Sequence, residues 1–351
     1  MKLKKILASG IVFSIIILYF CNAKTIVSAV KESLFLCYNT IIPSLFVFMV
    51  ISSFLSCFKS SDILSIPFSP LFRLLNITDK RLITYCVLSI LGGFATGGLF
   101  LNRISRELNC DKNLNYVLTV LTSNNSPAFI IVAVGLQMLG SLRTGVLLYI
   151  AVITSCYITA FVISFILPYD RLQPHKTDTY ITTDISDAIK YAVTGVMTIC
   201  GVVIFASTVC KVIQLYTNNS AVSVAFSVIC EVTNACNYIC SDLKKNLYLI
   251  CIAIVFFPLS AYFQMKSFDE NKIYSFKILF ISKIFQIPIA ICILRILVNL
   301  FPVSSSVYAN GDIKINMYWN SPHISIYLLI MSLCFVIMFD KKTGVFTKTN
   351  K

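Results

Sequence analysis

The sequence predicts an all-α polytopic membrane protein. Of its 351 residues, 57% are hydrophobic and only 13% are charged, whereas soluble domains carry about 25% charged residues. The mean hydropathy of +0.84 comes from the whole chain and not from a single leader segment. Helices are the expected form of these apolar segments, because lipid cannot satisfy unpaired backbone groups. The composition therefore excludes a water-soluble single domain.

Ten apolar segments follow one another along the chain, and roughly 20 such residues are needed for each helical crossing. They cover residues 6–21, 41–58, 82–101, 116–139, 144–167, 187–213, 221–240, 247–265, 273–300 and 322–339. The first segment follows a basic N-terminus, and we expect it to be an uncleaved anchor helix. A cleaved signal peptide is the alternative. Residues between the segments are expected to form loops.

Two of the ten segments are unsuited to an ordinary membrane-crossing helix. Segment 82–101 contains two glycine pairs, and each glycine inside a helix costs about 1 kcal/mol relative to alanine. Segment 221–240 is too polar for contact with lipid, since it contains Glu231, Thr233, Asn234 and Asn237. Both segments are expected to be broken or re-entrant helices. The prediction is thus about eight transmembrane helices plus two re-entrant elements.

The distribution of Lys and Arg supports this topology. With eight crossings and both termini in the cytoplasm, the inside loops contain three times as many basic residues as the outside loops. With ten crossings the excess of basic residues in the inside loops is much smaller, 14 against 10. Cytoplasmic loops of membrane proteins carry the excess of basic residues, so the eight-crossing arrangement is preferred.

The eight segments from 41–58 to 273–300 can be divided into two sets of four, and this division suggests internal symmetry. The second member is interrupted in each set, so each set contributes three crossings and the second set is inverted relative to the first. Inverted repeats are frequent in transporters, although any long polytopic chain can be divided in this way. The expected parts are an anchor helix (1–21), a first repeat (22–168), a polar linker (169–186), a second repeat (187–300), and a loop with the last transmembrane helix and a basic tail (301–351).

A polar stretch inside the fourth segment is the first candidate site. Ser126 followed by Pro127 is typical of a helix N-cap and first helical position, so a helix is expected to restart there within the membrane. Its free amide groups, together with Asn124, Asn125 and Ser126, would favour an anionic ligand such as a carboxylate. The alternative is a polar kink satisfied by a neighbouring helix.

The second half offers a matching cluster at Glu231, Thr233 and Asn234. Glu231 is the carboxylate that lies deepest in an apolar context, and ionisable groups within the membrane are usually functional. It is expected to take a proton or a coupling cation, or to neutralise Lys283; a purely structural pair with Lys283 is the alternative.

Pro258, Ser260 and Gln264 interrupt the apolar segment 247–265. This interruption has the same position in the second repeat as residues 124–127 have in the first. Ligand-binding roles are therefore predicted for Gln264 and for both clusters, which we expect to face each other across a midplane cavity.

Several short motifs together resemble one family. In chain order they are Pro43-Ser44-Leu45-Phe46, Gly93-Phe94-Ala95-Thr96-Gly97, Ser123-Asn124-Asn125-Ser126-Pro127 and Glu231-Val232-Thr233-Asn234. Their order resembles that of the YlbJ-like sporulation integral membrane proteins, within the nucleoside-recognition (Gate) domain group. The sequence departs from the family pattern at Phe94-Ala95, where the family has Tyr-Pro, and lacks a glycine before Pro127 and after Asn234.

The resemblance implies a transporter-like protein of the bacterial cell or forespore membrane. For the family it implies movement of dipicolinate, a small aromatic dicarboxylate, during spore maturation. The expected partners are therefore a small organic anion, such as dipicolinate, and the lipid bilayer. A non-transporting scaffold for spore envelope assembly is the alternative. Broken helices and a buried glutamate would discriminate between the two functions, because a scaffold needs neither.

The absence of known catalytic and metal-binding motifs disfavours an enzyme or a metalloprotein. The sequence has no HExxH, Gly-x-Ser-x-Gly or Walker-type motif, so we do not expect an enzyme. Its 14 cysteines include no CxxC pair and it has two histidines, so neither a metal nor a cofactor is expected. The net charge of +14 comes from basic residues in short loops, which is typical of membrane topology signals and not of nucleic-acid binding.

Overall fold

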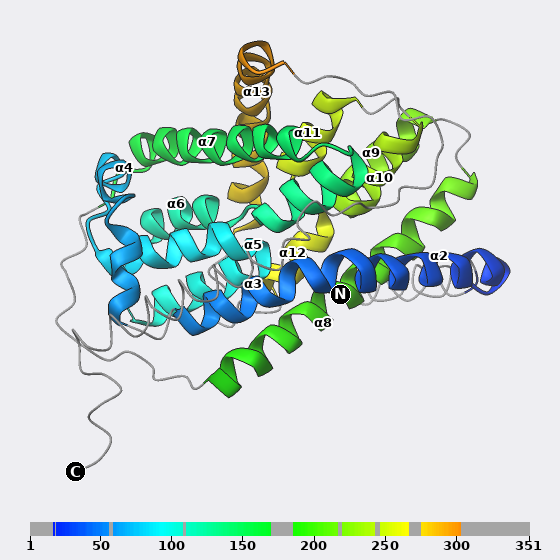
Figure 1. The fold of residues 1–351 in the computed structure, drawn as a ribbon, viewed down its shortest axis with the longest axis horizontal. Helices are drawn as coiled ribbons and strands as arrows, with labels where there is room; N and C mark the ends of the chain where they lie inside the picture. The colour runs from blue at the N-terminus through cyan, green and yellow to red at the C-terminus, as the bar shows by residue number, and fades with distance from the viewer. Residues whose placement is uncertain are drawn as a thin grey trace, which may run out of the picture. The chain divides into compact units, whose positions relative to one another are not determined.

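The computed structural model describes residue 17 and residues 19–55, 59–107, 110–169, 185–216, 220–242, 246–266 and 275–302. All of them belong to one compact unit, Met1–Val303. This part of the chain is helical and contains no strand (Figure 1). Most of the predicted anchor 6–21, nearly all of the linker 169–186, and the predicted last transmembrane segment 322–339 lie outside the described residues.

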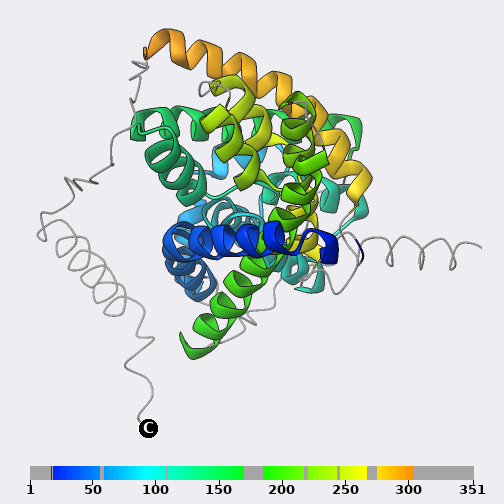
Figure 2. The same cartoon turned by 90° about the vertical axis from the view of Figure 1, so that its right-hand side faces the viewer.

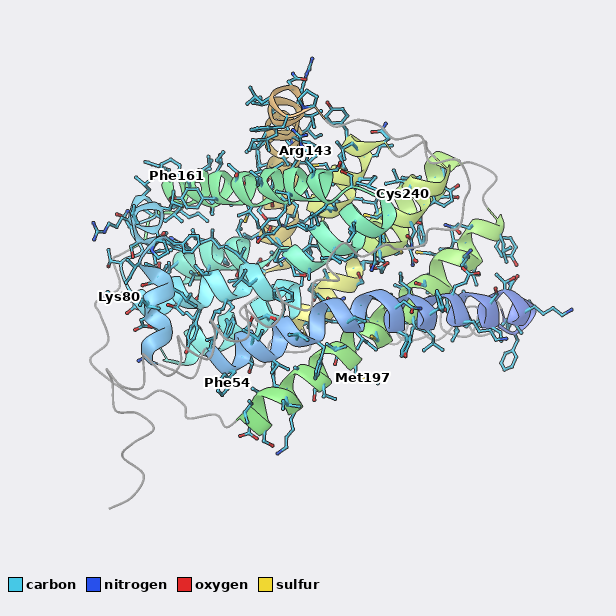
Figure 3. All side chains as sticks on the ribbon, in the orientation of Figure 1. Phe54, Lys80, Arg143, Phe161, Met197 and Cys240 are labelled. Carbon is cyan, nitrogen blue, oxygen red and sulfur yellow. The ribbon has the colours of Figure 1, made fainter. Side chains whose placement is uncertain are left out.

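Four helices in the described part are long and apolar enough to cross a membrane. They are Leu142–Ile166, Ile185–Tyr216, Leu247–Lys266 and Lys277–Leu300. Large apolar side chains such as Phe165 and Phe285 are exposed on two of these helices, and Met197 lies on the outer side of a third (Figure 3). The prediction of an all-helical membrane protein agrees with these observations.

The chain between the first two predicted segments is a helix and not the expected loop. Helix α2 (Ala23–Leu36) continues through the π-helix η1 (Cys37–Ile41) into α3 (Ile42–Leu55). Ala29 and Ser33 lie one turn apart and are buried, and α2 packs against α8 (Ile185–Tyr216) (Figures 1 and 2). This narrow buried face stabilises a helix whose exposed surface mixes charged residues with apolar ones such as Leu34 and Phe35, so overall hydropathy did not reveal it.

The predicted first break occurs in α5 (Lys80–Glu107) at Gly93. Its φ of 80° and ψ of −166° are non-helical, a conformation that glycine adopts without steric cost. The short helices η2 (Lys59–Ser65) and α4 (Ser69–Leu74) precede α5. The segment is therefore interrupted within its apolar part, as the glycine pairs predict.

The other predicted interruptions are also present. Helix α6 (Lys112–Thr122) ends before residues 123–127, and the π-helix η3 (Ala128–Met138) follows. Glu231 separates α9 (Ser220–Cys230) from α10 (Val232–Asp242). Residues 256–258 separate α11 (Leu247–Val255) from α12 (Leu259–Lys266). The four interrupted elements thus occur in two consecutive pairs, and each pair is followed by a long helix, α7 (Leu142–Ile166) or α13 (Phe276–Leu300).

Packing brings elements from distant parts of the sequence together. Helix α7 packs against α13, and α8 packs against both α2 and α3. The interrupted elements also meet across the chain, because α5 contacts α12 and η3 contacts α10. The breaks of all four interrupted elements consequently lie near one another in the interior.

Candidate functional site

A small cavity of about 50 Å³ lies where the four interrupted elements meet, and we call it the central cavity. Three elements contribute the residues at their breaks, and the fourth contributes residues of α12 that follow its break. Apolar side chains of η1, α3 and α8 close the remaining side. The lining residues are Gly92, Gly93, Phe94, Asn125, Ser126, Phe129, Glu231, Val232, Thr233, Ser260, Ala261 and Gln264, together with Ile41, Leu45, Ile199 and Val203.

Ser126 forms the N-terminal cap of η3 at one wall of the cavity. Its hydroxyl accepts a hydrogen bond from the Phe129 amide at 3.2 Å, which satisfies one of the free donors of the restarted helix. The neighbouring Asn125 donates to the Ile254 carbonyl at 2.9 Å. Gly93 packs on this turn so closely that a β-carbon would lie 3.1 Å from the Ser126 nitrogen. The break in α5 and the start of η3 are therefore fitted to each other.

Glu231 occupies the equivalent position at the start of α10. Its carboxylate accepts hydrogen bonds from the Thr233 hydroxyl at 2.8 Å and from the Asn234 amide at 2.7 Å, although the residue is only 1% exposed. Glu231 thus caps α10 with a carboxyl group, which carries a negative charge once its proton is lost. The thiols of Cys37, Cys210, Cys230 and Cys236 are among the titratable groups that interact with it electrostatically.

The structure brings five of the seven predicted ligand-binding residues to the central cavity. These are Asn125, Ser126, Glu231, Thr233 and Gln264. The other two are turned away from it. Asn124 donates to the Leu121 carbonyl at 3.0 Å, and Asn234 donates to the Ser207 hydroxyl at 2.6 Å. A role in ligand binding stays a prediction for all seven.

Lys283 does not pair with Glu231, which corrects the sequence-based expectation. Its ammonium donates to the Ser123 carbonyl at 2.7 Å, to Gln286 Oε1 at 2.8 Å and to Asn124 Oδ1 at 3.3 Å. The reason is packing, because α13 lies against α6 and α7 and therefore places Lys283 behind the 123–127 turn. The two buried charged residues have separate partners.

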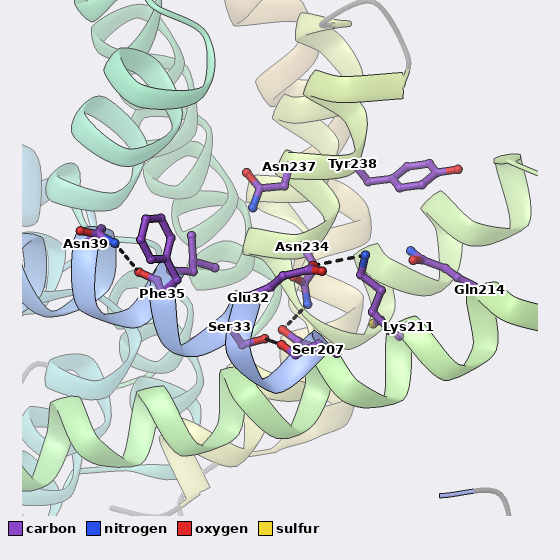
Figure 4. Close-up of a pocket in the computed structure, with 13 residues that line it drawn as sticks. Glu32, Ser33, Phe35, Asn39, Ser207, Lys211, Gln214, Asn234, Asn237 and Tyr238 are labelled. Carbon is purple, nitrogen blue, oxygen red and sulfur yellow. Dashed lines mark hydrogen bonds and ion pairs between the residues drawn. The ribbon is translucent and has the colours of Figure 1, made fainter. Parts of the chain in front are cut away.

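A larger cavity of about 560 Å³ lies between α2, α8 and α10, and we call it the lateral cavity (Figure 4). Glu32 and Lys211 form an ion pair of 3.3 Å in it. The N-terminal turn of α10 separates the two cavities, since Glu231 lines the central one and Asn234 lines the lateral one. Further polar lining residues are Ser33, Asn39, Ser207, Gln214, Asn237 and Tyr238.

Sequence reasoning missed most of the lateral cavity. Its polar residues come from α2, η1, α8 and α10, which are separated in sequence, and residues such as Ser33 and Gln214 are unremarkable in an amphipathic helix. The available signals were the polar Asn234 and Asn237 of segment 221–240 and Lys211, a cation five residues before the end of the long apolar helix α8.

Comparison of the chain with protein-family models, with curated proteins and with solved structures gives no match. The function is therefore inferred from the geometry of the site. The described part of the chain contains no group of three or more His, Cys, Asp or Glu side chains that could hold a metal ion. Polar uncharged groups, helix N-termini and one carboxylate are the chemistry that the central cavity offers.

Proposed function

We propose that the protein is a multi-pass membrane transporter that moves a small organic anion through the central cavity. The observation that carries the proposal is that three breaks and the helix α12, which begins directly after the fourth break, converge on this cavity. Broken helices whose ends meet inside the membrane are the usual form of a transporter substrate site. The N-terminal ends of η3 and α10 border the cavity, and helix N-termini favour anionic groups.

The order of the elements supports two inverted repeats and eight crossings. An interrupted helix, a second interrupted helix and a long helix follow one another as α5, α6–η3 and α7. The same order recurs as α9–α10, α11–α12 and α13. The cross-contacts are reciprocal as well, since α5 contacts α12 and η3 contacts α10. We therefore assign the repeats to residues 22–168 and 187–300, in which the break at Glu231 corresponds to that at Gly93 and the break at 256–258 corresponds to that at 123–127.

Glu231 links anion movement to a proton in this proposal. An ionised carboxylate in a small, buried cavity repels a second anion, and a dielectric constant below that of water strengthens the repulsion. Protonation of Glu231 removes the repulsion and leaves both hydrogen-bond donors at the α10 terminus in place. The anion and the proton would consequently enter the cavity together.

The cavity must widen for this purpose. Its volume of about 50 Å³ suits a few water molecules, which need about 10–15 Å³ each on this measure. Pockets for drug-sized ligands have about 300–1,000 Å³. Loading of an aromatic dicarboxylate therefore requires the half-helices to move apart, because the cavity described here is too small for it.

The resemblance to the YlbJ-like sporulation proteins supplies the proposed substrate, dipicolinate, and the proposed location in a bacterial cell or forespore membrane. The cavity lining agrees with a planar aromatic anion. Phe94 and Phe129 line it, and Phe94 packs edge-on against Phe257 at 5.5 Å. Aromatic rings offer such a ligand offset or edge-on contacts, while the amide and hydroxyl groups offer donors to its carboxylates.

Uptake of labelled dipicolinate into proteoliposomes tests the proposal. We expect the unmodified protein to transport it and Gln264→Glu to transport it at least about tenfold more slowly, because a second carboxylate in the lining repels the anion. The matched control is Gln137→Glu, the same change at an exposed position of η3, which should leave the rate unchanged. If the folded, unmodified protein catalyses neither uptake nor efflux of dipicolinate, the scaffold alternative is favoured.

The lateral cavity is the proposed access route to the central cavity. Lys211→Gln removes the cation that would attract an anion there, so we expect the uptake rate at low substrate concentration to fall several-fold. Added salt should shrink the difference, because it screens half-exposed charges. Lys190→Gln is the control, since Lys190 also lies on α8 in an ion pair, with Asp187 at 3.5 Å, outside the cavity. Equal rates for the two variants would exclude this route.

A further inference from the structure

Lys283 is a buried ammonium surrounded by neutral oxygen atoms. The residue is 1% exposed, and its three acceptors are the Ser123 carbonyl, Asn124 Oδ1 and Gln286 Oε1 at 2.7–3.3 Å. The ion pairs found in the described part of the chain do not include it. Burial of an unpaired ammonium costs several kcal/mol, so these three oxygens must compensate for much of that cost.

Two of the three oxygens are held in place by hydrogen bonds on the other side of their amide groups. The Gln286 amide nitrogen donates to the Val152 carbonyl at 3.2 Å, and the Asn124 amide nitrogen donates to the Leu121 carbonyl at 3.0 Å. Because a carbonyl only accepts hydrogen bonds, the NH₂ ends must face these partners. Oε1 of Gln286 and Oδ1 of Asn124 are therefore fixed toward the ammonium, in the way that outer partners orient metal ligands.

The third oxygen belongs to the chain just after the last residue of α6. Ser123 follows Thr122, where α6 ends, and the C-terminal end of a helix carries partial negative charge that favours a cation. Carbonyls of unwound chain and helix C-termini coordinate cations in transporters with broken helices. The same turn continues into Asn125 and Ser126, which line the central cavity. The cation thus lies directly behind the face proposed for the anion.

We propose that the Lys283 ammonium is the tethered occupant of a site built for a monovalent alkali cation. The cage consists of neutral, preoriented oxygens, which are the ligands that such an ion prefers. The lysine side chain holds its ammonium in the cage by a covalent tether. One consequence rests on the proposed function: transport needs no Na⁺ or K⁺, and the proton on Glu231 is the exchangeable charge.

Removal of the side chain should convert the cage into a site for a free cation. We expect the melting temperature of purified Lys283→Ala to rise by at least about 3 °C between 1 and 100 mM Na⁺ or K⁺, since a ligand that binds only the folded state stabilises it. The unmodified protein should show no such rise. Lys283→Met fills the cage with an uncharged chain of similar length, so it should not respond either. Choline chloride at the same concentrations controls for ionic strength.

Each outcome decides the proposal. A response of Lys283→Ala alone supports it. The proposal is overturned by a response of the unmodified protein, by equal responses of the alanine and methionine variants, or by a Lys283→Ala chain that remains unfolded at every alkali concentration. Because thermal unfolding is measured without substrate, these results do not depend on transport; loss of the proposed function would appear only in the dipicolinate uptake assay.

Discussion

Gly97→Ala is expected to abolish folding of the protein. An alanine β-carbon at this position would lie 2.1 Å from the Thr122 carbonyl oxygen and 3.0 Å from its carbon. Both atoms belong to the backbone of the last residue of α6, so no side-chain rotation relieves the clash. Separation of α5 from α6 would be the only remedy. A cost above about 4 kcal/mol is expected, against a total stability of about 5–15 kcal/mol for ordinary domains.

The measurement is the fraction of monodisperse protein after extraction into detergent and size-exclusion chromatography. Gly201→Ala is the matched control, because it makes the same change in α8 at a position with no heavy atom within 4 Å of the added β-carbon. That variant should be recovered like the unmodified protein, or be more stable by up to about 1 kcal/mol. Similar recovery of both variants would show that α5 and α6 do not pack as described.

The four interruptions could be predicted from sequence because each has a local cause. Gly93 permits a positive φ, Pro127 follows a capping serine, and Glu231 and Pro258 are each unfavourable inside an apolar helix. Such signals act within a few residues and need no knowledge of the fold. They also place five of the predicted residues at one cavity, because broken ends have unsatisfied groups that cannot face lipid.

The features that sequence reasoning missed depend on tertiary packing. Helix α2 is recognisable only once α8 covers its buried Ala29 and Ser33. The partners of Lys283 follow from the position of α13 against α6 and α7. The local sequence around Lys283 does not indicate that its ammonium binds Asn124 and not Glu231. The ion pair of Glu32 with Lys211 joins residues far apart in sequence in the same way.

Substitution of Glu231 by glutamine is expected to remove the pH dependence of transport and leave the fold intact. The glutamine oxygen can accept from the Asn234 amide, and its NH₂ group can donate to the Thr233 hydroxyl, which both donates and accepts. Both contacts of the native carboxylate are thus retained. By contrast, Glu231→Ala removes the cap of α10, which costs about 0.5–2 kcal/mol.

The pH profile of dipicolinate uptake is the measurement that separates a coupling role for Glu231 from a capping role. If the anion enters only when Glu231 is protonated, uptake by the unmodified protein should increase as the pH falls, by at most about tenfold per pH unit for one proton. Glu231→Gln resembles the protonated form, so its uptake should stay nearly constant with pH. Asp187→Asn, which removes an exposed carboxylate of α8, should retain the full profile. A folded Glu231→Gln variant with an unaltered profile would restrict Glu231 to capping α10, and the coupled proton would have to be carried by another group.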